Sequence, residues 1–224
     1  MVLTKKIKRE TGRDYALRTL RENIVHLELA PGSMVGEVEL ASQMGLSRTP
    51  VREALIELSK TEIVAVYPQK GSRIAYIDEH LIEEVQFMRN VLECAVVEQA
   101  CACATEEDIA RLRENVSLQR YYLDRSSREA MELDRKMHKM LFEITDKLHV
   151  YQQMQPMMIH CDRLQWLSYQ TVDNRRIVGD HEELVERIAR RDASAACEMM
   201  ETHLNYSKVD VIEISRRYPQ YFHP

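Results

Sequence analysis

Glycine and proline are scarce in this chain of 224 residues, which contains six of each. Their scarcity excludes collagen-like and turn-rich β architectures, because those folds need frequent chain reversals. Long apolar runs are missing too: no stretch approaches the roughly 18 apolar residues that a membrane-spanning helix needs, and the charged segment MVLTKKIKRETGR has no apolar run behind it. We therefore expect a mostly helical protein of the cytoplasm, without a membrane partner.

Cysteine is present, but not in the pattern of a disulfide framework or a zinc finger. The five cysteines form an odd set without a CxxC pair. Most lie in helical patterns beside alanine and valine, so buried free thiols are the simpler interpretation and a redox or metal role is the alternative.

Charge divides the chain into two parts. Residues 1–78 contain 12 Lys and Arg against 10 Asp and Glu, a net charge of +2. Residues 79–224 contain 19 against 26, a net charge of −7. This division predicts two domains, 1–78 and 79–224, of which the first tolerates a polyanionic partner.

The first domain carries the pattern of a helix-turn-helix. A helix is predicted over about 37–44, and Gly45 follows it where a left-handed C-terminal cap belongs. Ser47 then stands where an N-cap begins the next helix, and Pro50 lies in its first turn, where a missing N–H costs little. Two helices joined by so short a turn are typical of DNA-binding modules.

The faces of the second helix suggest how it would be used. Val51 and Leu55 belong to its apolar stripe, whereas Arg48, Thr49 and Arg52 remain outside on the N-terminal half, the part that enters a major groove. The following segment IVAVYPQKGSRIAYI alternates like two strands around a basic turn. A basic hairpin after a helix-turn-helix predicts a wing. The alternative is a helical hairpin with a solvated face and an unrelated β-ribbon.

The stretch PGSMVGEVELASQMGLSRTPVREALIELS with its QKG turn resembles the winged helix of the GntR superfamily of bacterial transcription regulators, over about 13–77. The resemblance implies contacts with phosphates and bases from the residues that open the recognition helix and from the wing tip. Those residues are Ser47, Arg48, Thr49, Arg52, Lys70 and Gly71. The chain departs from the family twice: Val38, expected to point inward, replaces a DNA-contacting arginine of some members, and Glu62 replaces a usual glycine.

The second domain is predicted to be an antiparallel bundle of six helices with short connections. The predicted helices span about 79–102, 105–123, 127–147, 149–170, 174–191 and 193–217. Thr105 begins a capping box for the second of them. For the aromatic final segment RRYPQYFHP we expect fraying, with folding back on the bundle as the alternative.

Four side chains of this domain have the spacing of a metal site. Asp134 and His138 stand four residues apart on one helix face. If Asp192 lies in the turn of a helical hairpin, His181 and His203 lie opposite each other on its two helices, because each is about 16 Å from the turn. One carboxylate and three imidazoles suit a divalent transition metal such as Zn, Ni or Mn. A single such histidine would more often be an ordinary core or surface residue.

The same four residues resemble the metal ligands of the FCD effector-binding domain in the FadR-type branch of the superfamily, over about 79–217. Six helices would resemble its VanR-type subgroup. The resemblance implies a small carboxylate effector, such as a sugar acid, hydroxy acid or amino acid. It also makes Arg89 the candidate partner of that carboxylate, with an ion pair to Glu93 as the alternative. Trp166, the only tryptophan, is a candidate for the pocket mouth or for a core anchor.

These observations favour a homodimeric, effector-responsive transcription regulator, more often a repressor in this family, which binds a palindromic operator in double-stranded DNA. Two winged helices related by a twofold axis would read more base pairs than one. Two alternatives stay open: a metal-dependent enzyme acting on a small organic acid, and a DNA-binding dimer with a purely structural metal. The absence of an HExxH-type base and the attached winged helix speak against the enzyme.

Overall fold

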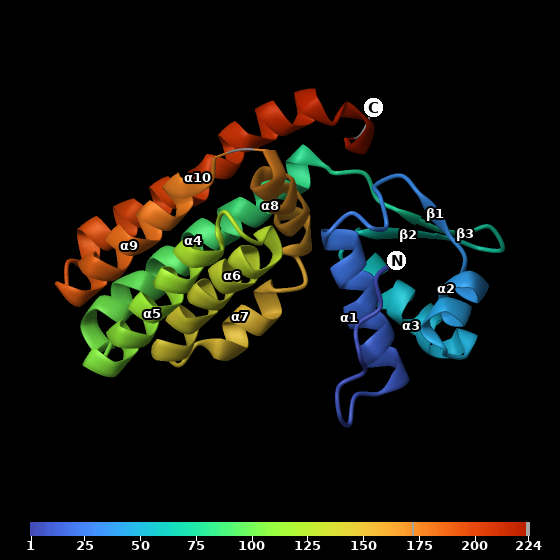
Figure 1. Ribbon diagram of the computed structural model, residues 1–224, viewed down its shortest axis with the longest axis horizontal. Coiled ribbons are helices and arrows are strands. Elements are labelled where there is room, and N and C mark those ends of the chain that lie inside the picture. Colours follow the sequence, from blue (N-terminus) through green and yellow to red (C-terminus); the bar gives the residue numbers. More distant parts are fainter. Residues whose placement is uncertain (172, 223–224) are drawn as a thin grey trace. The chain divides into compact units, whose positions relative to one another are not determined.

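The structure is a computed structural model that describes residues 1–171 and 173–222. The chain forms two compact units, labelled by element in Figure 1. Unit 1 comprises Met1–Glu79 together with the segment from Ser215 onward, and unit 2 comprises His80–Ile214. The first division lies one residue from the predicted boundary, whereas the segment from Ser215 groups with unit 1 and not with the domain to which the sequence assigns it.

Three helices build the core of unit 1: α1 (Gly12–Val25), α2 (Glu37–Met44) and α3 (Arg48–Ser59). The apolar stripe predicted for α3 is buried, and so are Leu40, Ala41 and Met44 of α2, whereas Val38 is exposed. Gly45 follows α2 with a φ of 65°, so it provides the left-handed cap that the sequence predicts. The helix-turn-helix is therefore present with the predicted bounds of α2.

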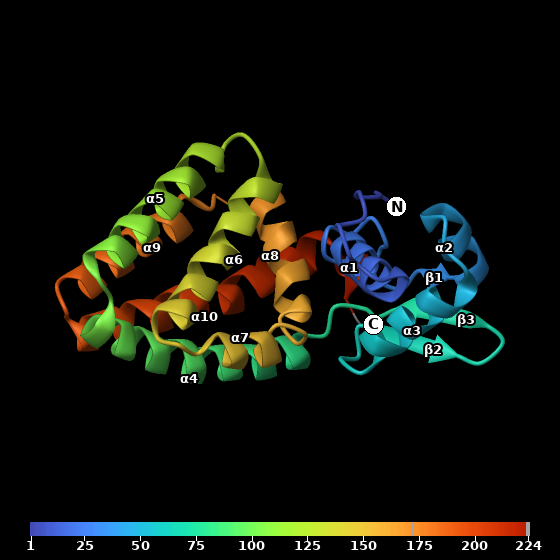
Figure 2. The same ribbon diagram turned by 90° about the horizontal axis from the view of Figure 1, so that it is seen from below.

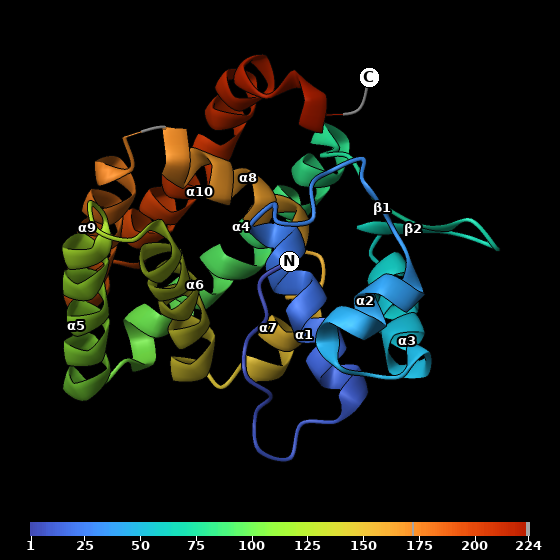
Figure 3. The same ribbon diagram turned by 45° about the vertical axis from the view of Figure 1, so that its right-hand side comes forward.

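A three-stranded sheet completes the winged helix. The strands are β1 (Met34–Val35), β2 (Val64–Tyr67) and β3 (Gly71–Ile74), and β3 lies between the other two in antiparallel pairing. The sequence predicts the β2–β3 hairpin but not β1, which has only two residues. Figure 3 shows the hairpin turn projecting from the sheet.

The segment after α10 is ordered and packs within unit 1, which corrects the expectation of a frayed tail. A 3₁₀ helix, η1 (Pro219–Tyr221), precedes Phe222, which pairs with Ile77 in a parallel bridge. The Ile77 N–H donates to the carbonyl of Tyr221 at 2.8 Å. Phe222 is buried, because it is only 7% exposed. Burial of this ring provides the free energy that orders the segment, and residues 223–224 lie outside the described part.

Unit 2 is entirely helical in its described residues, and Figure 2 shows its helices from below. Its helices are α4 (Glu79–Cys103, beginning at the end of unit 1), α5 (Glu106–Tyr122), α6 (Ser127–Ile144), α7 (Leu148–Met154), α8 (Ile159–Thr171), α9 (Arg175–Ala189) and α10 (Ala193–Arg217, which runs on into unit 1). The capping box at Thr105 is present with Asp108 as its partner. The core includes apolar side chains of α4, α5, α6, α9 and α10.

One predicted helix is in fact two. The span 149–170 divides into α7 and α8, so the described residues of unit 2 contain seven helices where the sequence predicts six. Pro156 lies in the interruption between the two helices. Proline lacks an N–H and clashes with the preceding turn, which explains why a continuous helical periodicity does not give a continuous helix here. None of the described helices is long and apolar enough to span a membrane.

Candidate functional site

The recognition helix α3 presents its charged N-terminal half to solvent. Ser47, Arg48, Thr49 and Arg52 are all exposed, whereas Val51 is fully buried. The side chains of Arg48 and Arg52 are 62% and 58% exposed. Ser47 occupies the N-cap position, but its hydroxyl makes no capping hydrogen bond. The side chains predicted to contact DNA are therefore available for it.

Glu37, at the start of α2, forms ion pairs with Arg48 and Arg52. Its carboxylate lies 2.9 Å from Arg52 Nε and 3.5 Å from Arg48 Nη2. The hydrogen bond from Arg52 lowers the pKa of Glu37, so the carboxylate stays charged. The guanidinium groups are thus paired with an oxyanion, in the way that a phosphate would pair with them. Sequence spacing does not indicate a role for this residue, because it lies on the other helix of the motif.

The wing and α3 line a single open groove. Its walls include Glu37, Arg48, Arg52, Lys70 and Gly71. Gly71 has a φ of 98°, and an added Cβ would lie 2.8 Å from the carbonyl oxygen of Val35. The turn therefore requires glycine, both for its backbone angle and for the closeness of β1.

The two departures from the family pattern have structural counterparts. Val38 is 62% exposed and lines the groove, which corrects the expectation that it points inward. The start of α2 turns this residue away from the core, while Leu40 and Ala41 are buried. Glu62 has a φ of 60°, a left-handed angle that costs a non-glycine residue free energy.

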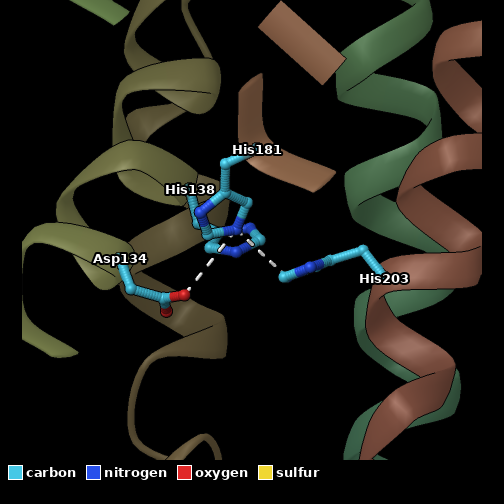
Figure 4. A group of neighbouring side chains, drawn as sticks. All are labelled: Asp134, His138, His181 and His203. Carbon is cyan, nitrogen blue, oxygen red and sulfur yellow. Dashed lines mark hydrogen bonds and ion pairs between the residues drawn. The ribbon is translucent and has the colours of Figure 1, made fainter. Parts of the chain in front are cut away.

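In unit 2 the four predicted metal ligands converge from three helices, as Figure 4 shows. Asp134 and His138 come from α6, His181 from α9 and His203 from α10. One ligand atom of each lies within 4.8 Å of the others. His181 Nε2 lies 3.2 Å from His203 Nε2 and 3.6 Å from Asp134 Oδ1.

The outer nitrogens of His181 and His138 each contact a side-chain oxygen, whereas that of His203 lies beyond hydrogen-bond distance of its nearest carboxylate. His181 Nδ1 donates to Gln119 Oε1 at 2.7 Å, and His138 Nδ1 contacts the Glu93 carboxylate. His203 Nδ1 lies 3.7 Å from Asp180 Oδ2. Because Nδ1 of His181 donates its proton to the Gln119 amide oxygen, Nε2 of His181 keeps its lone pair for the centre of the cluster. Acceptors of this kind behind metal-bound histidines are a general feature of metalloproteins.

Two observations show that the cluster fits a cation. Asp134 Oδ1 and His138 Nε2 are buried and have no hydrogen-bond partner among the described residues, and both face the cluster. Burial lowers the pKa of His181 well below its ordinary value, and His203 and His138 lower it further. Neutral imidazoles and a carboxylate are the donors that a divalent transition metal requires.

Arg89 is connected to this cluster through Glu93, which contacts both Arg89 and His138. Its Nε lies 2.7 Å from Glu93 Oε1, and Glu93 in turn contacts His138. Burial opposes the charge of Glu93, but the guanidinium and the imidazole hold the pKa of Glu93 far below its usual range. The ion pair that the sequence leaves open as an alternative is therefore present.

A small cavity of about 60 Å³ adjoins the cluster within unit 2. Arg89 and His203 both line it, so one cavity connects the candidate metal ligands with the candidate carboxylate partner. Gln86 also lines it; this side chain is 4% exposed, and its Oε1 has no hydrogen-bond partner among the described residues. Trp166, half-buried on α8, is not among the residues that line this cavity.

A winged helix with exposed arginines, joined in the chain to a helical unit that holds a carboxylate and histidine cluster, is the architecture of a DNA-binding transcription regulator. Comparison with known proteins agrees with this class. Residues 14–74 match the model of the gntR family of bacterial regulatory proteins, and residues 84–206 match the FCD domain. The chain belongs to the gntR family of transcription regulators and carries an FCD domain.

Curated relatives match over nearly the whole chain. The HTH-type transcriptional repressor RspR of Escherichia coli K12 is 29% identical over 207 residues, which cover 92% of this chain and 91% of RspR. An HTH-type regulator from an unstable DNA locus of Streptomyces ambofaciens is 31% identical, with 96% and 90% covered. These are DNA-binding transcription regulators, and this chain is one too, not an enzyme.

Solved structures share the fold. E. coli McbR/YncC has a TM-score of 0.78 and 17% identity, and the alignment covers 93% of this chain and 99% of the other. A GntR regulator from Rhodococcus sp. RHA1 has a TM-score of 0.73 and 19% identity, with 90% and 97% covered. At such identities the likeness concerns the fold alone.

Proposed function

We propose that this chain is a homodimeric, metal-containing transcription repressor of the bacterial cytoplasm that releases a palindromic operator when it binds a small carboxylate. The observation that carries the proposal is the cavity that joins His203, one of four clustered ligands, to the buried guanidinium of Arg89. The description of its relative RspR as a repressor supports the direction of control.

The metal would be held by Asp134, His138, His181 and His203, and Zn, Ni and Mn all accept such donors. When bound, it would supply positive charge for a carboxylate that has left water. Arg89 would supply the second positive group, although Glu93 already pairs with it. The effector carboxylate would therefore share this guanidinium with Glu93.

The size and polarity of the cavity narrow the class of effector. A water molecule needs roughly 10–15 Å³ of such volume, so about 60 Å³ suits a short acid better than an extended sugar acid. The free Oε1 of Gln86 can accept a hydrogen bond from a hydroxyl or ammonium group of the effector. We therefore favour a short hydroxy acid or amino acid over an unsubstituted carboxylate.

The experiment is a thermal-shift screen of the metal-loaded chain against short hydroxy, amino and unsubstituted acids, followed by mobility-shift assays with operator DNA. We expect a stabilising acid to weaken operator binding by roughly 5–150-fold, the usual range of coupling between sites. His181→Ala should lose both the metal and this response but still bind DNA.

The competing function is a DNA-binding dimer whose metal is only structural. It would be supported if the chelated chain melts at lower temperature while no acid in the screen changes its melting or its operator affinity.

A further inference from the structure

A second cluster of metal-ligating side chains lies outside the Asp134 and histidine site. Cys94 belongs to α4, and Cys197 and Glu201 belong to α10. One sulfur from each cysteine and one carboxylate oxygen lie within 4.8 Å of one another. Cys197 and Glu201 are four residues apart, which places them on one face of α10. Cys94 Sγ lies 3.7 Å from the carbonyl oxygen of Cys197, so the two helices are in contact here.

The dimensions of this cluster match a thiolate site. Thiolate sulfur binds zinc at about 2.3 Å, so two sulfurs of a tetrahedral site stand about 3.8 Å apart. The observed limit of 4.8 Å leaves only a small closing movement of the side chains. Both cysteines are half-buried and Glu201 is exposed, so an ion can enter from solvent. We propose that Cys94, Cys197 and Glu201 form a second metal site for a thiophilic divalent cation such as Zn²⁺ or Cd²⁺.

Cys94 and Cys197 are both free thiols, so their sulfurs are available to a cation. A bound cation would compensate the charge of two thiolates and one carboxylate and displace the thiol protons.

The two sites differ in the cations that they select but share one helix. Sulfur donors prefer softer ions than the one carboxylate and three imidazoles of the first site. Cys197 precedes His203 by six residues, about 9 Å along α10. Occupation of the sulfur site would join α10 to α4 close to a ligand of the first site. The chain would then bind two cations of different chemical class.

Cadmium titration of the full, reduced chain tests the proposal, because the ultraviolet cadmium–thiolate band reports only sulfur ligands. We expect a saturable band equivalent to two thiolates per chain, at least half of it lost in Cys94→Ser and in Cys197→Ser. Glu201→Gln should weaken cadmium binding by at least about tenfold, the lower end of the loss caused by removing a supporting residue. Cys103→Ser removes an exposed thiol that is not part of the cluster and should leave the band unchanged.

Cadmium NMR of the unmutated chain gives an answer even if a serine variant fails to fold. A resonance in the range of mixed sulfur and oxygen ligands would support the site. The proposal is overturned if the serine variants keep the full band, if no sulfur-bound resonance is found, or if peptide mapping finds a Cys94–Cys197 disulfide in the purified chain. None of these outcomes affects the proposed effector response, which is measured at the first site.

Discussion

At the scale of single residues, the arginines proposed to contact DNA and the lysine of the wing can be tested separately. Arg52→Ala should lower operator affinity by about 1–3 kcal/mol and reduce discrimination between operator variants, because a base contact is lost. Lys70→Ala should weaken binding to all sequences alike and lower the salt slope by about one. Mobility-shift assays at several salt concentrations measure both effects. Arg13→Ala, which removes a half-exposed arginine paired with Glu57 in the same unit, is the control.

Glu62 provides a test of backbone strain. Its φ of 60° costs a non-glycine residue roughly 1–2 kcal/mol. Glu62→Gly should therefore stabilise the chain by about 1 kcal/mol or less, because glycine also gains freedom in the unfolded state. Glu62→Ala keeps the Cβ and should bring no such gain. Equal melting temperatures for the Gly and Ala variants would contradict the strain.

Glu93 contacts one of the proposed metal ligands, His138. Glu93→Gln should weaken metal affinity by about 10–100-fold, because the carboxylate that orients His138 is replaced by a neutral amide. Competition with a coloured chelator measures the affinity, and the melting temperature of the metal-free chain checks the fold. Glu98→Gln, which changes an exposed glutamate of the same helix, should bind metal normally.

The residues of the candidate metal site differ in how far the sequence predicts them. Asp134 with His138, and His181 with His203, follow from helical spacing and from the symmetry of a hairpin. Their partners do not, because Glu93 and Gln119 stand 45 and 62 positions from the histidines that they contact. Only the packing of separate helices brings such pairs together.

At the scale of elements, periodicity predicts helices well and their interruptions poorly. The span 149–170 keeps an apolar pattern through Pro156, so the break between α7 and α8 depends on one missing N–H group. The strand β1 has only two residues and exists because β3 offers it a partner, which no local pattern expresses. The ordered segment around Phe222 likewise depends on a distant partner, Ile77.

The sheet of unit 1 gives a prediction at this scale. Gly71→Ala should lower the stability of unit 1 and the operator affinity, because a Cβ would clash with β1 and the φ of 98° disfavours alanine. Gly12→Ala is the control in the same unit, since a Cβ there meets only ordinary contacts of 3.6 Å or more. Thermal melting and mobility shift compare the two variants, and equal losses in both would contradict the explanation.

At the scale of the whole molecule, the proposed dimer needs an apolar contact surface. Phe87 and Val91 stand one turn apart on α4 and are 72% and 55% exposed. The double change of Phe87→Glu and Val91→Glu should reduce the mass measured by light scattering to one chain, 26.3 kDa, and weaken operator binding. Leu118→Glu, at an exposed apolar position of α5, should remain a dimer. A double variant that stays dimeric would place the interface elsewhere.

The pairing of Phe222 with Ile77 places the end of the described chain within unit 1. The chain leaves unit 1 after Glu79 and returns to it at Ser215, so unit 2 is an insertion in the sequence of unit 1. The last described residues therefore belong to the same unit as the first, and a chain truncated before Phe222 would lose a buried ring from unit 1 while keeping the residues of both candidate ligand sites.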